Sequence, residues 1–228
     1  MRFDPPLVSG TLVRRYKRFL ADVVLDDGRE VTAHCPNPGS MRTCAEPGWR
    51  VWLSPATNPS RKLRWTWEIV LAGAAAVPTL VNTARPNGVV RAAIAASQIP
   101  ELAGYASIRP EVRYGQNSRI DLLLTEPQGG RPDCYVEIKN VTLTQGDGCV
   151  SFPDSVTKRG TKHMLELAKV AEEGKRAVVF FLVSRMDATR MVPADEIDPA
   201  YGRALRDAVS SGVEAMAYRA QISEHTLG

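Results

Sequence analysis

The sequence predicts a two-domain α/β protein, with a small β-barrel at residues 1–84 followed by an α/β domain with a mixed central sheet at residues 85–228. Three observations support this prediction. Residues 11–84 contain short strand-like segments separated by turns and no helical period. The rest of the chain alternates helical and strand-like segments, which is typical of an α/β domain. Within it, residues 177–183 form a nearly unbroken apolar run, as expected for a strand covered on both faces.

The first domain contains about five predicted strands. Segments 23–25 and 31–33 flank Asp26-Asp27-Gly28-Arg29, a strong hairpin signal, and further strands are expected at 48–53 and 77–81. In segment 62–71, apolar side chains alternate with polar ones, so we expect one face in the core. The apolar members are Leu63, Trp65, Trp67, Ile69 and Leu71. A small all-β unit of this kind resembles the oligonucleotide-binding (OB) fold.

The loop at residues 34–40, His-Cys-Pro-Asn-Pro-Gly-Ser, cannot form a regular ladder. Its two prolines lack a backbone donor, and its glycine permits an unusual turn. Loops of this shape often bind ligands, although the sequence does not assign a role to this one.

The second domain begins with a helix expected over residues 88–99. Strands follow at 107–114, 119–125 and 134–143, with a turn at 115–118 between the first two. A second helix is predicted to begin between residues 153 and 161 and to end at Gly174. The apolar strand 177–183, an amphipathic helix at 198–210 and a short strand at 213–218 complete the domain.

The composition is that of an ordinary soluble globular protein, with 44% hydrophobic and 24% charged residues. Charged residues and prolines near the start exclude a secretory signal peptide, and the longest apolar stretch is about half the length of a membrane span. We therefore expect a cytoplasmic protein without a membrane partner. The four cysteines lack the short paired spacing of a zinc site. The oligomeric state is left open, a homodimer included.

The formal net charge of +4 originates in the first domain. Its 84 residues hold 11 Lys and Arg against 7 Asp and Glu, whereas the other residues hold 18 of each. The densest basic cluster interleaves cations with Tyr16 and Phe19, and it consists of Arg14, Arg15, Lys17 and Arg18. This pattern favours contact with the phosphate backbone of DNA, and Arg64 is a further candidate. A charged strand edge is the structural alternative.

Two carboxylates stand in neighbouring strand-like segments. Asp121 and Glu137 each lie in an apolar run, and Lys139 follows Glu137 on the same face of its strand. A buried carboxylate is costly unless it is paired or binds a metal, and these oxygen ligands suit Mg²⁺ or Mn²⁺. We predict a phosphodiester-hydrolysing site in which Asp121 and Glu137 bind the metal, with Lys139 and an additional acid, Glu111, as further catalytic residues. The alternative is a structural Asp–Lys or Glu–Arg ion pair, with Arg119 close to Asp121 in the sequence.

A basic segment follows at the start of the second predicted helix. Lys158 and Lys162 are four residues apart, as are Arg159 and His163, so each pair lies on one side of the helix. The three cations are candidates for binding the phosphate backbone. The alternative is a solvated helix start, and a histidine in such a position is more often a packing residue than a catalyst.

Several of these segments resemble the sugar fermentation stimulation protein A family. They are residues 15–22, 34–41, 118–121, 135–139 and 152–163, so the resemblance extends over nearly the whole chain. Pro38 stands where many members have Thr. The resemblance implies an OB-like barrel followed by a PD-(D/E)xK nuclease-like domain, DNA binding and a role in regulating sugar (maltose) metabolism. By position, Asp121, Glu137 and Lys139 match the nuclease core, and Glu111 its additional acid.

Two functions are consistent with these expectations. One is a Mg²⁺- or Mn²⁺-dependent nuclease with little sequence preference. The other is a non-catalytic DNA-binding regulatory module that keeps the nuclease fold without turnover, because folds of this kind also serve in binding alone.

Overall fold

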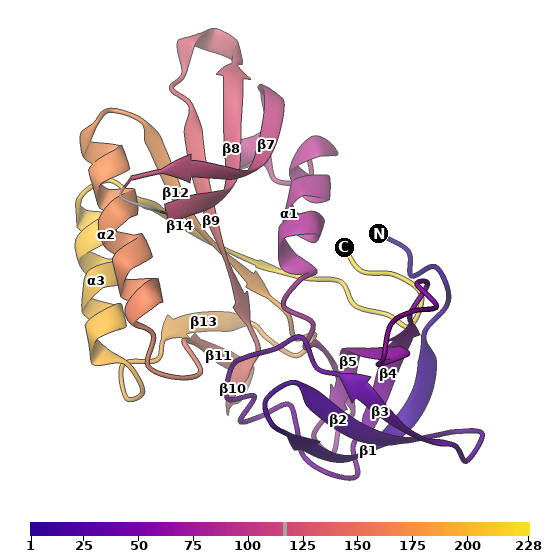
Figure 1. The fold of residues 1–228 in the computed structure, drawn as a ribbon. Helices are drawn as coiled ribbons and strands as arrows, with labels where there is room; N and C mark the ends of the chain where they lie inside the picture. Colours follow the sequence, from indigo (N-terminus) through magenta and orange to yellow (C-terminus); the bar gives the residue numbers. More distant parts are fainter. Residues whose placement is uncertain (116–117) are drawn as a thin grey trace.

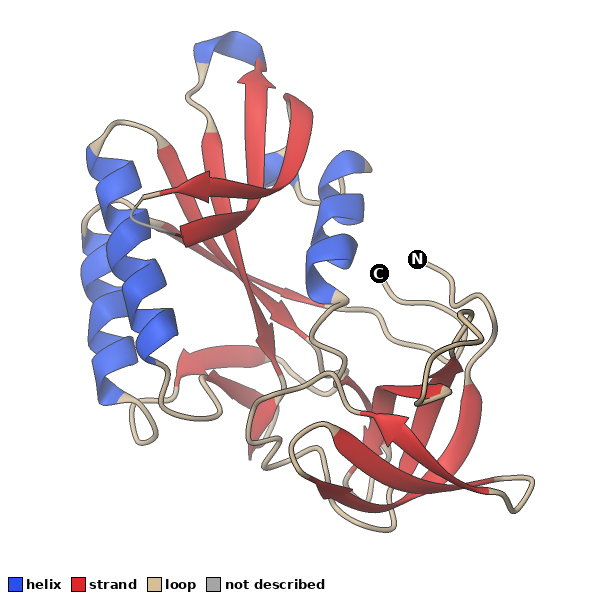
Figure 2. Ribbon diagram, viewed as in Figure 1, coloured by secondary structure: helices blue, strands red, loops and turns tan. Residues whose placement is uncertain are grey.

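The computed structural model describes residues 1–115 and 118–228, which form two packed domains (Figure 1, Figure 2). The first domain is built of strands joined by loops, and the second places helices on both faces of a sheet. The predicted barrel followed by an α/β domain with a mixed sheet is confirmed. Residues 116 and 117, in the middle of the turn predicted at 115–118, lie outside the described residues. No helix in the described residues is long and apolar enough to cross a membrane.

The barrel is a sheet closed on itself. Its strands are β1 (Val8–Tyr16), β2 (Leu20–Leu25), β3 (Glu30–His34), β4 (Arg50–Pro55), β5 (Trp65–Ala72) and β6 (Val77–Leu80). They are ordered β3-β2-β1-β4-β5-β6, and a short parallel pairing of β3 with β5 closes the ring. The predicted hairpin connects β2 to β3, with Gly28 at a φ of 87°.

Strand β5 departs from the predicted alternation at Glu68. Leu53 pairs with Trp67 and Trp52 with Ile69, so Glu68 is an extra residue opposite β4, which defines a β-bulge. Trp67 is buried in the barrel, as predicted. Beyond the bulge the alternation is displaced by one residue, and Ile69 packs in a core shared with the second domain. The prediction of one continuous apolar face is therefore wrong after Trp67.

The bulge buries Glu68, which the predicted alternation places on the polar face of the strand. It is 1% exposed and receives two hydrogen bonds from the guanidinium of Arg85, at 2.6 and 2.9 Å. Ser54 and Asn82 donate one further hydrogen bond each, at 2.7 and 2.8 Å. Four donors thus compensate the desolvated carboxylate, and the Arg85 pair fixes the chain where it passes from the barrel to the second domain.

The second domain surrounds a five-stranded mixed sheet ordered β14-β12-β9-β8-β7. Strands β9, β12 and β14 are parallel, and β7 and β8 continue the sheet in antiparallel fashion. A small sheet, β10-β11-β13, was not predicted. The elements are α1 (Pro86–Ala95), β7 (Tyr105–Tyr114), β8 (Ser118–Pro127), β9 (Cys134–Val141), β10 (Leu143–Gly146), β11 (Cys149–Phe152), α2 (Lys158–Glu172), β12 (Arg176–Val183), β13 (Arg190–Pro193), α3 (Pro199–Ser210) and β14 (Glu214–Arg219), with short 3₁₀ helices at Pro100–Leu102 and Gln128–Gly130.

The helix ends follow local chemistry. The Thr157 hydroxyl accepts a hydrogen bond from the Gly160 N–H and caps α2, and the Asp198 carboxylate caps α3 by accepting from the Tyr201 N–H. Gly174, with a φ of 78°, follows the end of α2 as predicted. Helix α1 was predicted over residues 88–99 but begins at Pro86 and ends before Ser97. Ser97 has a φ of 54°.

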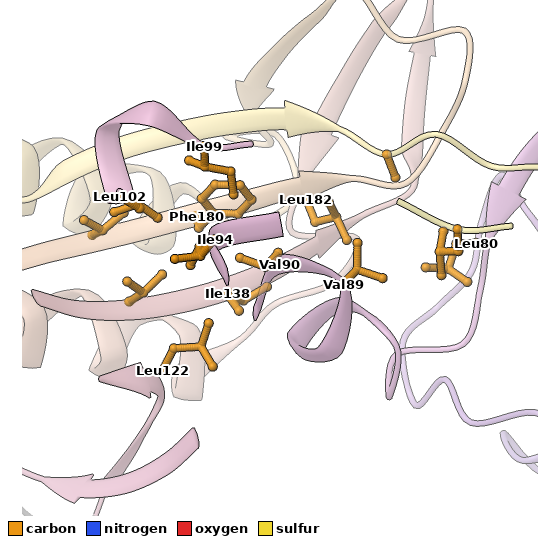
Figure 3. Close-up of a cluster of buried hydrophobic side chains, with 14 of the residues drawn as sticks. Leu80, Val89, Val90, Ile94, Ile99, Leu102, Leu122, Ile138, Phe180 and Leu182 are labelled. Atoms are coloured by element: carbon orange, nitrogen blue, oxygen red, sulfur yellow. The ribbon is translucent and has the colours of Figure 1, made fainter. Parts of the chain in front are cut away.

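Two apolar layers enclose the central sheet. Helix α1 packs on one face, where the core includes Leu80, Val89, Val90, Ile94, Ile99, Leu102, Leu122, Ile138, Phe180 and Leu182 (Figure 3). Helices α2 and α3 cover the other face, against Val179 and Phe181 of β12. Because Ile69 and Leu80 come from the barrel strands β5 and β6, the first of these cores also joins the two domains.

Candidate metal centre

Asp121 on β8 and Glu137 on β9 lie opposite each other, at the end of the regular pairing between these two strands. The last paired residues are Leu122 and Val136, and the two carboxylates are the next residues along their strands. Residues that face each other across neighbouring strands project to the same side of the sheet. Asp121, Glu137 and Lys139 accordingly line one cavity of about 370 Å³.

Asp121 is held by two donors. One carboxylate oxygen accepts a hydrogen bond from the side-chain amide of Asn87 at 2.8 Å, and the other accepts from the Ile138 N–H at 2.7 Å. Burial, followed by repulsion from Glu137, raises the pKa of Asp121 to about 6, and these hydrogen bonds oppose the shift. Arg119, the alternative partner considered from the sequence, is exposed.

Glu137 is 3% exposed and uses its two oxygens differently. Its Oε1 contacts the Lys139 ammonium at 2.6 Å and the Nδ1 of His163. Burial favours a raised pKa for this carboxyl, but His163 and Lys139 outweigh it and lower the pKa, which keeps Glu137 ionised. Its Oε2 is buried and has no hydrogen-bond partner among the described residues.

The barrel contributes one wall of this cavity through Asn37, Pro38 and Gly39. The guanidinium of Arg15 donates to the carbonyls of Asn37 and Gly39 at 2.9 and 3.0 Å, so the loop is fixed from the barrel side. From the other side, the Asp154 carboxylate accepts a hydrogen bond from the Met41 N–H at 3.1 Å. The cavity is therefore formed by both domains.

The donor set fits a hard divalent cation. Asp121 and Glu137 supply two carboxylates, and the unpartnered Oε2 of Glu137 is a buried ligand atom without a protein donor. No cluster of three or more His, Cys, Asp or Glu side chains in metal-binding geometry occurs in the described part of the chain. Water and phosphate oxygens would complete the coordination, as is common for Mg²⁺ in phosphate-processing sites.

Glu111, the predicted additional acid, lies apart from this arrangement. It is exposed on the edge strand β7, where its φ of 54° marks an irregularity, and it does not belong to the described lining of the cavity. The structure brings together three of the four predicted catalytic residues.

The predicted DNA-binding cations of the barrel differ in their environments. Arg14 is exposed and forms an ion pair with Asp22 at 2.8 Å, and Arg15 is committed to the 37–39 loop. Lys17 and Arg18 are exposed in the turn between β1 and β2, both at positive φ. Arg64 is exposed and donates to the Pro59 carbonyl at 2.7 Å.

The cations at the start of α2 differ in their relation to the cavity. Lys158 and Arg159 are exposed, and Arg159 lines the cavity and donates from Nε to the Nε2 of His163 at 3.3 Å. Lys162 is exposed and forms an ion pair with Glu166 at 3.5 Å. Of the three predicted cations of this helix, Arg159 is the one in the described lining of the cavity that holds the two carboxylates.

Three contributors to the site were not predicted in this role. His163 was treated as secondary, although its four-residue spacing from Arg159 is the signal that places it toward the cavity. Asn87 had no sequence signal, and Asp154 was assigned no role although it lies in segment 152–163 of the family resemblance. The contacts of both residues depend on tertiary packing between segments far apart in the chain.

Family models match both parts of the chain. The model described as "SfsA N-terminal OB domain" matches residues 13–81, and the model described as "Sugar fermentation stimulation protein RE domain" matches residues 84–226. The chain belongs to the sugar fermentation stimulation protein family. The first domain is therefore the family's OB domain, and the second has the PD-(D/E)xK nuclease-like fold expected from the sequence.

Individual relatives agree with this assignment. Proteins described as sugar fermentation stimulation protein homologs are 58% identical in Pelobacter propionicus (98% of this chain, 94% of the relative) and 57% identical in Geobacter sulfurreducens (97% and 93%). The solved structure described as Pyrococcus furiosus SfsA in complex with Ca²⁺ is similar with a TM-score of 0.88 and 26% identity. The similarity covers 100% of this chain and 94% of the Pyrococcus furiosus chain.

Proposed function

We propose that this protein binds DNA with little sequence preference and hydrolyses phosphodiester bonds at a Mg²⁺ or Mn²⁺ held by Asp121 and Glu137. One observation carries the proposal. Two buried carboxylates from adjacent strands line one cavity with Lys139, and one oxygen of Glu137 has no partner in the described protein.

Each residue has a chemical role in this proposal. Asp121 and Glu137 would hold the cation, which when bound polarises a phosphoryl oxygen and lowers the pKa of a bound water. Lys139, 12% exposed at its side chain, would donate to a phosphate oxygen or hold the attacking water. Arg159, at the rim of the same cavity, would bind a neighbouring phosphate. Glu111, the additional acid expected from the sequence, is exposed on β7 apart from the cavity and is assigned no role in this proposal.

The divalent cation is supported by the relative from Pyrococcus furiosus, whose structure is described as a complex with Ca²⁺. Ca²⁺ and Mg²⁺ both prefer oxygen ligands, and they differ in coordination number and rigidity. We infer that an ion bound by this chain would occupy the Asp121–Glu137 pair, because both carboxylates line the cavity and one oxygen of Glu137 has no partner among the described residues.

DNA binding is supported by the exposed cations. Lys17, Arg18 and Arg64 are exposed on the barrel, and Lys158, Arg159 and Lys162 are exposed on α2, where Arg159 also lines the cavity. Contacts of this kind are made with the phosphate backbone and carry no sequence information. The affinity should therefore fall steeply with salt concentration and vary little with sequence. A role in regulating sugar metabolism, implied by the family name, would act through this DNA binding.

A nicking assay on supercoiled plasmid with Mg²⁺ or Mn²⁺ tests the proposal. Wild type should cleave, and Glu137→Gln should lower the rate by about 100-fold or more, because it removes the charge of a ligand. Glu172→Gln, an exposed change on α2, is the matched control and should cleave as wild type does. Wild type and Glu137→Gln that are equally inert with both metals would contradict catalysis.

A non-catalytic DNA-binding regulatory module is the second candidate. It is favoured by the internal neutralisation of Glu137, whose Oε1 is already bound by Lys139 and His163. Salt-dependent DNA binding without cleavage, measured by fluorescence anisotropy, would select this alternative. DNA affinity that does not respond to salt would contradict both candidates.

A further inference from the structure

His163 on α2 links the candidate metal centre to the rim of the cavity. Its ring is 5% exposed, its Nδ1 contacts the Oε1 of Glu137, and its Nε2 accepts a hydrogen bond from the Nε of Arg159 at 3.3 Å. All three residues line the same cavity. The helical spacing of four residues places Arg159 and His163 on one side of α2.

These contacts define the tautomer of the His163 ring. A guanidinium nitrogen can only donate, so the Nε2 that accepts from Arg159 carries no proton. The ring proton is consequently on Nδ1, where it is donated to Glu137. The Lys139 ammonium lies 3.3 Å from the same Nδ1, but two donors do not form a hydrogen bond with each other, so Lys139 also donates to Glu137.

The two donors determine how the Glu137 carboxylate is oriented. Both bind Oε1, and together they fix the plane of the carboxylate from two elements, β9 and α2. Oε2 is left as the oxygen without a partner among the described residues. A donor that orients a ligand in this way lowers the cost of ordering that ligand when the cation binds.

We propose that His163 is a positioning residue that holds Oε1 of Glu137 through its Nδ1–H, so that Oε2 is presented to the divalent cation. The inference rests on the proposed function, since it requires that Glu137 bind a cation. In this role His163 acts on the cation through Glu137.

A residue that only packs in the core would behave differently. His163 lies between buried neighbours on α2, so its loss is also expected to lower thermal stability. A packing role predicts lower stability with an unchanged affinity for the cation in the folded protein. A positioning role predicts that the affinity depends on which atom of the replacement can donate to Glu137.

Three variants separate these roles, with Mn²⁺ alone as the probe in isothermal titration calorimetry. The amide of Asn in His163→Asn occupies the place of Nδ1, whereas the amide in His163→Gln reaches the place of Nε2. His163→Ala removes both. Glu172→Gln serves as the control, and thermal melts verify that each variant is folded.

We expect His163→Asn to bind Mn²⁺ within a factor of about 3 of wild type, and His163→Gln and His163→Ala to bind about 10- to 100-fold more weakly. Where His163→Ala does not fold, the comparison of His163→Asn with His163→Gln decides, because both retain a polar side chain. Equal affinities for these two variants would overturn the inference, and so would failure of all three to fold.

The test also separates this inference from the function on which it rests. Wild type that binds no Mn²⁺ would overturn the proposed function and the inference together. Wild-type binding that is lost in Glu137→Gln but unaffected in His163→Gln and His163→Ala would overturn the inference alone.

Discussion

Gly39 of the barrel lies directly against Asp154 of the second domain. A Cβ at position 39 would lie 2.6 Å from the carboxylate Oδ2 of Asp154, which is closer than carbon and oxygen can approach. The same oxygen accepts the hydrogen bond from the Met41 N–H, so it cannot move away without breaking that contact. The wall that the barrel contributes to the cavity therefore requires glycine here.

Gly39→Ala should destabilise the protein by about 1–3 kcal/mol, because the added methyl group overpacks this contact. Urea unfolding measures the change. In an Asp154→Ala background the same substitution should cost clearly less, since the opposing oxygen is absent, and a double-mutant cycle quantifies the coupling. Purely additive effects of the two substitutions would contradict the contact.

Arg85→Ala should be strongly destabilising, by about 3–5 kcal/mol, because it leaves the carboxylate of Glu68 buried without its cation. Chemical denaturation provides the measurement. Arg91→Ala on α1 is the matched control, since Arg91 is exposed, and it should change stability by less than about 0.5 kcal/mol. A small effect at Arg85 would mean that Ser54 and Asn82 alone compensate Glu68.

Asp121 should make the stability of the metal-free protein depend on pH. Its pKa in the folded protein is about 6, above the usual 3.8, so the folded state retains a proton that the unfolded chain has released. The stabilisation by this proton is complete below about pH 4 and is lost as the pH rises to about 6. The stability of wild type relative to Asp121→Asn should therefore fall by on the order of 2–3 kcal/mol between about pH 4 and pH 7.

Urea unfolding in the presence of a chelator at several pH values measures this difference. Asparagine has one acceptor oxygen where aspartate has two, so the substitution also changes the free energy of unfolding in a way that does not depend on pH. Comparing the two proteins across pH cancels this constant contribution. Asp207→Asn, at an exposed position of α3, should show no such change. A pH-independent difference for Asp121→Asn would refute the raised pKa.

The barrel cations should contribute unequally to DNA binding. Removing Lys17 and Arg18 together should reduce the slope of log affinity against log salt concentration by up to about 2, since each neutralised phosphate contributes about 0.9. Arg14→Ala should have a smaller effect, because Asp22 already balances its charge. Fluorescence anisotropy across a salt series measures both, and identical slopes would exclude this surface from the interface.

The sequence was sufficient for the order of the two domains and for most of their elements, because these features are locally encoded. The Asp-Gly hairpin, the apolar run of β12 and the glycine after α2 each act through neighbouring residues, and each occurs where it was predicted. Of residues 143–152, only residue 143 was assigned to a predicted strand. These residues form β10 and β11, two strands of a small sheet. The third strand, β13, pairs with β11 and lies about 40 residues further along the chain.

The candidate site was predictable only in part, because some of its contacts join segments far apart in the chain. Asp121, Glu137 and Lys139 follow from spacing within two strands and from the register between them. His163 and the 37–39 loop approach from other elements. The four-residue spacing places His163 and Arg159 on one side of α2, but it does not encode the contact of His163 with Glu137. The burial of Glu68 was not predicted, because a charged side chain is expected at the surface unless it is paired. Its partner, Arg85, is 17 residues away in the sequence.

The bulge at Glu68 has a consequence for how the molecule unfolds. By displacing the alternation of β5 by one residue, it directs Trp67 into the barrel and Ile69 into the core beneath α1, so a single strand belongs to two hydrophobic cores. Neither core can lose this strand without exposing part of the other. The two domains should therefore melt cooperatively, in one calorimetric transition whose van't Hoff enthalpy equals the measured enthalpy for the entire chain.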